Sequence, residues 1–157
     1  VPGRRVDDNV HVQMRLAGGA RGQLWASQVA VGAANGLRLR VYGEDAGLEW
    51  SQEEPDLLRY TRLGQAPQIL RRGGPGLSPA AAAATRLPAG HPEGYLEGFA
   101  QIYADAAELI EARRDGRAPA ELASLVPGVG AGVEGLAFIE AVVASHRADG
   151  AWTELAA

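Results

Sequence analysis

The sequence predicts an α+β domain: an open-faced, mostly antiparallel sheet of about six strands, with two C-terminal helices packed on one face. Three observations predict it. Apolar and polar residues alternate through much of residues 10–71, the period of half-buried strands. Short turns separate these runs, which favours antiparallel pairing. Residues 92–146 then carry apolar residues at helical spacing, and helices that follow an antiparallel sheet define the α+β class.

The first two strands are expected at about residues 10–16 and 23–31, joined by the tight turn "AGGA". In the second strand, Trp25, Val29 and Val31 share one face, because they are separated by even numbers of residues. An apolar face opposite the core would be a solubility liability unless another surface covers it.

The dipeptide Asn35-Gly36 is the strongest short hairpin signal, because both central residues of a type I′ turn need positive φ. It predicts that the second strand turns directly into the third. Four more strands are expected at residues 37–42, 48–50, 57–63 and 68–71.

The segment 73–90 is rich in Gly, Pro and Ala. It predicts a long loop with a short turn of helix through residues 80–84. Loops of this length are uncommon in compact domains and are often functional.

The first long helix is expected to begin at Pro92, which suits the first helical position, and to end at Gly116. Its acidic residues fall mostly on the side opposite an apolar stripe of Tyr95, Phe99, Ile102, Tyr103, Ala106 and Ile110. The second helix, about residues 130–146, is apolar nearly all round and is expected to lie buried under the first helix or on the sheet. The last residues, 151–155, predict an edge strand.

Composition places the chain among ordinary globular domains. Its 157 residues fit a single domain, with 46% hydrophobic and 22% charged residues. A net charge of −4 without basic runs argues against nucleic acid as a partner. The apolar runs are expected to be too short to span a bilayer, which takes roughly 20 residues, so no membrane partner is expected and a cytoplasmic location is the default. Cysteine and lysine are absent.

A G-x-G-x-x-G spelling occurs at Gly130, Gly132 and Gly135. A dinucleotide loop needs a buried strand before it and an acidic residue about 20 positions onward. Pro127 and the short, mixed segment before it do not fit such a strand. We therefore expect no cofactor-binding residues here and interpret the small residues as allowing close helix packing.

His91 is the most interesting of the three histidines, because it lies where the long loop enters a helix and its side chain could face a cleft. A plain helix cap is the alternative. His11 and His146 are more simply structural or solvated. Glu93 and Glu97 are more simply a solvated helix face, and the acidic segment 52–56 is a surface turn or a contact for substrate hydroxyls. No catalytic or metal-site motif occurs in these residues.

Two blocks carry a family resemblance: "GLEWSQEEP" at residues 47–55 and "GHPEGY" at residues 90–95. With the order of the surrounding segments, nearly the whole chain resembles the C-terminal domain of Gfo/Idh/MocA-family oxidoreductases. The resemblance implies NAD or NADP in a parent enzyme that transfers hydride to or from a sugar, inositol or related polyol. It also implies that the nucleotide loop and a catalytic lysine belong to an N-terminal Rossmann domain outside this chain, and that a helix with the acid–base histidine comes before the strands seen here.

The same resemblance implies partners and site residues. His91 and Tyr95 are expected to contact substrate, whereas no catalytic residue is expected in the chain, which alone would be inactive. The exposed sheet face would form homo-oligomers through Trp25, Val29 and Val31. The alternative is a noncatalytic ligand-binding or assembly module with the same open sheet, and the sequence upstream of this chain would distinguish the two.

Overall fold

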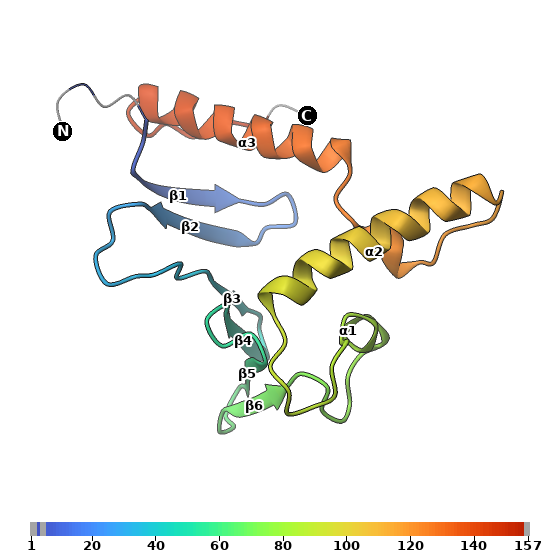
Figure 1. Cartoon of the computed structure of the whole chain (residues 1–157). Helices are drawn as coiled ribbons and strands as arrows, with labels where there is room; N and C mark the ends of the chain where they lie inside the picture. The colour runs from blue at the N-terminus through green and yellow to red at the C-terminus, as the bar shows by residue number, and fades with distance from the viewer. Residues whose placement is uncertain (1–2, 4–5, 156–157) are drawn as a thin grey trace. The chain divides into compact units, whose positions relative to one another are not determined.

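The computed structural model describes residues 3 and 6–155 (Figure 1). The chain divides into two compact units. Residues 35–126 form one of them. The two ends of the chain, residues 1–34 and 127–157, form the other.

The unit made by the chain ends contains a two-stranded antiparallel ribbon, β1 (Asn9–Arg15) with β2 (Arg21–Ser27). Gly19 in the connecting turn has φ of 87°, a conformation that favours glycine. Strand β2 ends at Ser27, four residues earlier than expected. The Ser27 hydroxyl accepts the N–H of Val29 at 3.2 Å, and this local bond replaces a bond to the neighbouring strand. Val29 and Val31 therefore lie beyond the strand and do not share its face with Trp25.

The predicted Asn35-Gly36 hairpin is also wrong. Gly36 has positive φ, but Asn35 does not, so the turn is not type I′. The Asn35 side-chain amide instead donates to the Gln52 side chain. As a result β2 does not pair with the next strand, β3 (Arg38–Tyr42).

The unit 35–126 contains a four-stranded antiparallel sheet in the order β3, β4 (Ala46–Ser51), β5 (Leu57–Arg62), β6 (Gln68–Arg71). The six antiparallel strands of the α+β prediction are thus confirmed, divided over two sheets. Alternation gives the four-stranded sheet a charged face and an apolar face. A cross-strand row of Arg40, Glu49 and Arg59 lies on the charged face, and Trp50 is paired with Leu58 on the other.

The expected short helix is present as α1 (Pro79–Ala83), capped by the Ser78 hydroxyl. The long helix α2 (Tyr95–Arg114) begins three residues later than predicted, with Gly94 as its N-cap. Pro92 is therefore not its first residue, and His91 is not its cap. The Glu97 carboxylate accepts the Gly94 N–H at 2.8 Å and satisfies the first amide. A 3₁₀ turn, η1 (Leu122–Leu125), contacts α2.

The orientation of α2 differs from the prediction. The large side chains of its apolar stripe are exposed, from 49% at Ile102 to 75% at Tyr103. The polar side, with Gln101, Asp105 and Glu108, is half-buried instead. Arg86 donates to Gln101 and Gln101 to Asp105, so hydrogen bonds draw the polar side of the helix toward the preceding loop.

Helix α3 (Val129–Arg147) belongs to the unit made by the chain ends and has no buried residue. Phe138, Ala141, Val142 and Ser145 are half-buried along one side, while Val133, Leu136 and Ile139 are exposed. The expected edge strand at residues 151–155 does not form. Trp152 instead lies under the guanidinium of Arg15, whose Cζ is 3.9 Å from the ring centroid.

The segment Leu122–Arg147 is long and apolar enough, by length and composition, to cross a bilayer. The expectation that no run reaches this length is therefore wrong. Glu134 and Glu140 lie within the segment, and carboxylates inside a bilayer are expensive. A helix that packs on another protein surface meets the same composition test.

Candidate functional site

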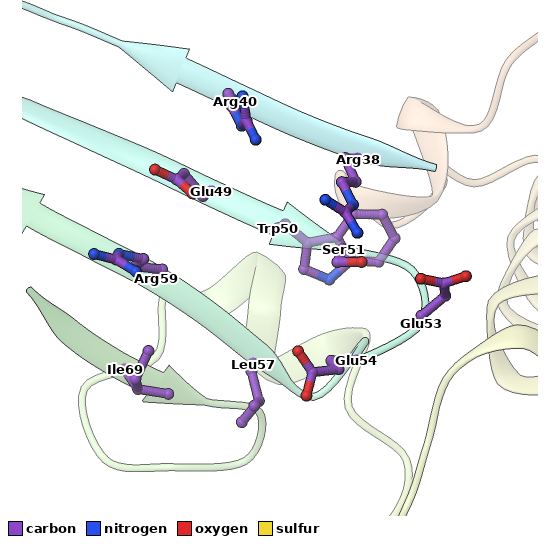
Figure 2. A pocket seen from close by; sticks show the side chains of 10 residues that line it. All are labelled: Arg38, Arg40, Glu49, Trp50, Ser51, Glu53, Glu54, Leu57, Arg59 and Ile69. Atoms are coloured by element: carbon purple, nitrogen blue, oxygen red, sulfur yellow. The ribbon is translucent and has the colours of Figure 1, made fainter. Parts of the chain in front are cut away.

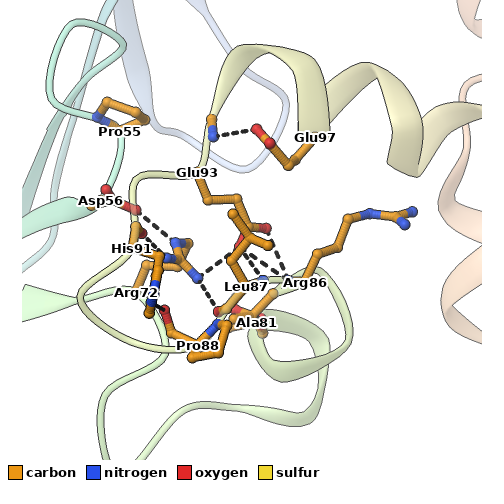
Figure 3. A network of polar contacts seen from close by, with 12 residues as sticks. Pro55, Asp56, Arg72, Ala81, Arg86, Leu87, Pro88, His91, Glu93 and Glu97 are labelled. Carbon is orange, nitrogen blue, oxygen red and sulfur yellow. Dashed lines mark hydrogen bonds and ion pairs between the residues drawn. The ribbon is translucent and has the colours of Figure 1, made fainter.

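The loop between α1 and α2 is organised around an ion pair in which the carboxylate is buried and the guanidinium is partly buried (Figure 3). The Glu93 side chain is only 4% exposed and lies 2.7 Å from Nη1 of Arg72. Its two oxygens also accept the backbone N–H groups of Arg86 and Leu87, at 2.7–3.1 Å. A buried carboxylate needs such partners to offset its lost hydration.

The Arg72 guanidinium also donates hydrogen bonds to the turn before β5 and to two carbonyls of the loop. Its Nε donates to Asp56 at 2.6 Å, Nη1 to the Leu87 carbonyl at 2.8 Å, and Nη2 to the His91 carbonyl at 2.6 Å. The fork geometry of arginine suits several directed bonds from one group. Arg72 therefore connects the end of the sheet to the loop that enters α2.

The two sequence blocks that suggested a family lie against each other at this junction. The Trp50 indole donates to the Pro55 carbonyl at 3.1 Å and closes the turn after β4. Pro55 lies directly beside Gly94, where a Cβ atom would stand 2.7 Å from the Pro55 Cγ. Gly94 is needed for this close approach, since a side chain there would clash with the proline ring.

His91 is exposed, and its position is defined by three hydrogen bonds. Its carbonyl accepts from Arg72, its N–H donates to the Pro88 carbonyl at 3.2 Å, and its Nδ1 lies 3.3 Å from the same carbonyl. A proton on Nδ1 satisfies that contact and leaves Nε2 as a hydrogen-bond acceptor. Within the described part of the chain, Nε2 has no partner.

Tyr95, the first residue of α2, is 67% exposed. Its ring meets that of Phe99 edge-on, with centroids 5.1 Å apart. Only four positions separate Tyr95 from His91 in the sequence, but no hydrogen bond or ring contact joins the two described side chains.

Sequence reasoning missed Arg72, interpreted Asp56 as part of a surface turn or substrate contact, and treated Glu93 as part of a solvated face. Glu93 is in fact among the few buried residues of the described chain. The sequence holds only a weak signal that Glu93 is buried. It lies between Pro92 and Gly94, before the helix, so the helical period does not predict which way its side chain faces. The acidic segment 52–56 is divided, because Asp56 pairs with Arg72 while Glu53 and Glu54 face a surface depression.

That depression, of about 410 Å³, lies along the charged face of the four-stranded sheet (Figure 2). Arg38, Arg40 and Arg59 line it together with Glu49. No ion pair within 4 Å joins these four described side chains, so their charges remain available to a polar ligand or surface. Charges of both signs alternate, which does not favour one ligand charge.

The G-x-G-x-x-G residues are not preceded by a strand, as sequence reasoning expected. Gly130, Gly132 and Gly135 lie inside α3 rather than in a turn before it, and η1 precedes the helix in place of a strand. The packing explanation is not supported, since a Cβ at each glycine would meet nothing within 4 Å.

Trp25, on the exposed side of β2, forms a small polar cluster with β1. Its indole donates to Asn9 at 2.8 Å, and its ring stacks on His11 with centroids 5.9 Å apart. Trp25 is 60% exposed, and so are Val29 and Val31 beyond the strand, at 56% and 104%.

Antiparallel strands, a polar junction and apolar C-terminal helices with exposed faces define an α+β domain of the open-sheet class. The chain matches the model of the oxidoreductase family C-terminal alpha/beta domain, Gfo/Idh/MocA, over residues 1–155 and belongs to that family. A curated relative, the uncharacterized oxidoreductase YfiI of Bacillus subtilis (strain 168), is 36% identical over 151 residues, which are 95% of this chain and 38% of the relative.

The chain is also similar to solved structures of oxidoreductases. An oxidoreductase from Sinorhizobium meliloti is 47% identical with a TM-score of 0.87, over 98% of this chain and 43% of that chain. An inositol dehydrogenase homolog from Azotobacter vinelandii, complexed with NADH and myo-inositol, is 40% identical with a TM-score of 0.86, over 94% of this chain and 39% of that one. The present chain thus spans about two fifths of these relatives.

Proposed function

We propose that this chain is the substrate-binding and oligomerisation domain of an NAD(P)-dependent oxidoreductase that acts on a sugar, inositol or related polyol. The observation that carries the proposal is the 40% identical relative whose structure contains NADH and myo-inositol. The chain spans about two fifths of that relative. We therefore assign nucleotide binding and hydride transfer to a longer parent protein, which would include an N-terminal Rossmann domain.

The described residues do not fit the nucleotide themselves. The glycines of α3 lie within a helix, and every strand is antiparallel, whereas dinucleotide binding needs a strand and a helix N-terminus around the loop. The nicotinamide, held by the rest of the parent, would supply the hydride chemistry. The chain alone is therefore expected to be inactive.

The role proposed for this chain is to hold polyol hydroxyls. His91 offers an exposed ring with Nε2 free to accept a hydroxyl proton in a hydrogen bond. Tyr95 offers a phenol that can donate or accept and an exposed ring for the apolar side of a sugar. Both roles depend on a substrate reaching the start of α2.

The proposal can be tested in the full-length parent with a panel of inositols and aldoses, each with NAD⁺ or NADP⁺, by following the absorbance of the reduced nicotinamide. We expect turnover of at least one polyol. His91→Ala should raise its KM, because a hydrogen bond to the substrate is lost. His146→Ala, at the end of α3, is the matched control. A parent that turns over no polyol, while bound ligands raise its melting temperature, would favour the noncatalytic module.

We also propose that the exposed side of β2, around Trp25, with Val29 and Val31 beyond it, forms an interface between copies of the parent. Their exposure supports this, since water-facing apolar side chains favour burial against a partner. Trp25→Glu should lower the sedimentation coefficient of the parent, whereas Arg113→Glu, at an exposed position of α2, should have less effect. A parent that sediments as a monomer without substitution would contradict the interface.

A further inference from the structure

The Arg72–Glu93 pair holds the backbone on both sides of His91. Arg72 binds the His91 carbonyl directly and the Leu87 carbonyl four residues earlier. Glu93 binds the amides of Arg86 and Leu87, which precede the Pro88 carbonyl that faces the His91 ring. The loop 86–93 is thereby closed on itself around two opposite charges (Figure 3).

The same contacts also restrict the orientation of the His91 side chain. The Pro88 carbonyl faces both the N–H and the Nδ1 of His91, so the position of Pro88 sets the orientation and the favoured tautomer of the imidazole. Since Pro88 follows directly after Leu87, the contacts of Arg72 and Glu93 with Leu87 set where that carbonyl points. A change at Glu93 would reach the His91 ring through one peptide unit.

Stability alone is a weak reason for such a cluster. A buried ion pair often contributes little net stability, because desolvation opposes the attraction, although removal of one partner is costly. Here every polar group of the pair has a directed partner, and most of the partners belong to the loop that carries His91. Such a network holds a surface residue in one geometry.

We propose that Arg72 and Glu93 are positioning residues that present the Nε2 of His91 to a substrate hydroxyl. This inference rests on the proposed role of His91 in polyol binding. Neither Arg72 nor Glu93 touches the substrate in this proposal. Both act through the Leu87–His91 backbone.

The test is a double-mutant cycle in the full-length parent, assayed with NAD⁺ and myo-inositol or, if that is not turned over, the polyol used fastest in the panel. Glu93→Gln keeps the side-chain shape and removes the charge. We expect kcat/KM to fall roughly 10- to 100-fold, the size of a misplaced binding group, mainly through KM. Glu111→Gln, the same change at an exposed position of α2, should leave kcat/KM unchanged.

In the His91→Ala background, Glu93→Gln should reduce kcat/KM by no more than about twofold, because the residue that it positions is already gone. The same large loss in both backgrounds would overturn the positioning role. If His91→Ala by itself changes neither KM nor kcat, the proposed function of His91 fails instead, and the two failures are thus distinguishable.

A second readout does not depend on turnover. Nitrogen NMR of histidine-labelled parent at neutral pH should show His91 with its proton on Nδ1, and Glu93→Gln should move it toward a mixture of tautomers. An unchanged His91 signal in a folded Glu93→Gln protein would contradict the proposal. If that variant does not fold, Arg72→Lys replaces it, because lysine keeps the charge but lacks the fork that reaches both the Leu87 and His91 carbonyls. The same outcomes then decide the proposal.

Discussion

The junction before α2 and the helix α3 reverse the usual distribution of polar and apolar side chains. At the junction, Glu93 is 6% exposed and its charge is fully paired. On α3, Leu136 is 65% exposed although the helix is apolar nearly all round. The junction satisfies its groups within the chain, whereas α3 leaves apolar surface uncovered. The comparison teaches that directed hydrogen bonds can bury a charge within one unit, whereas an apolar composition alone does not bury a helix.

The largest effect is expected where the junction is most tightly packed. Gly94→Ala places a methyl group 2.7 Å from the Pro55 ring, and relief of such overpacking costs about 1–3 kcal/mol. The melting temperature of the protein that carries this domain should fall. Gly98→Ala is the matched control, because nothing lies within 4 Å of its Cβ position inside α2 and alanine favours a helix. Equal effects at the two positions would show that Pro55 does not restrict Gly94.

A smaller effect of opposite sign is expected on α3. Gly132 lies inside the helix, and a methyl group added to its Cα would have nothing within 4 Å, so Gly132→Ala should stabilise the helix by about 0.5–1 kcal/mol. Circular dichroism of the chain during heating measures this. A destabilised chain would indicate that another backbone approaches Gly132 closely, and the contrast with the junction would then weaken.

The smallest effect concerns pH. Hydrogen bonds from Arg117, and then from the Ala120 N–H, lower the pKa of Glu108 from 4.5 to about 2. Because the folded pKa is depressed, this contribution to stability is complete above about pH 4.5 and is lost as the pH falls toward 2. Glu108→Gln should therefore flatten the dependence of the unfolding midpoint on pH in that window. An unchanged dependence would show that the Arg117 pair contributes nothing measurable, as many exposed pairs do.

Sequence reasoning predicted the six strands, the short helix and both long helices to within a few residues, because two- and near-four-residue periods survive in the amino-acid order. It failed where a side chain replaced a backbone partner. Ser27 ended a strand early, and the Asn35 amide bonded to Gln52 instead of forming a hairpin turn. At the site, it selected His91 and Tyr95 but missed Arg72, since nothing local connects residue 72 to residues 87 and 91.

The sequence by itself determined the class of the domain, the order of its elements and the family, because those depend on periodicity and on contiguous motifs. Only the tertiary structure decided which side of α2 faces inward and that Glu93 is buried. Burial of a charge depends on partners brought from distant positions, here Arg72 from the end of β6. The hydrogen bond from Arg86 to Gln101 draws the polar side of α2 toward the preceding loop, while the large side chains of its apolar stripe stay exposed.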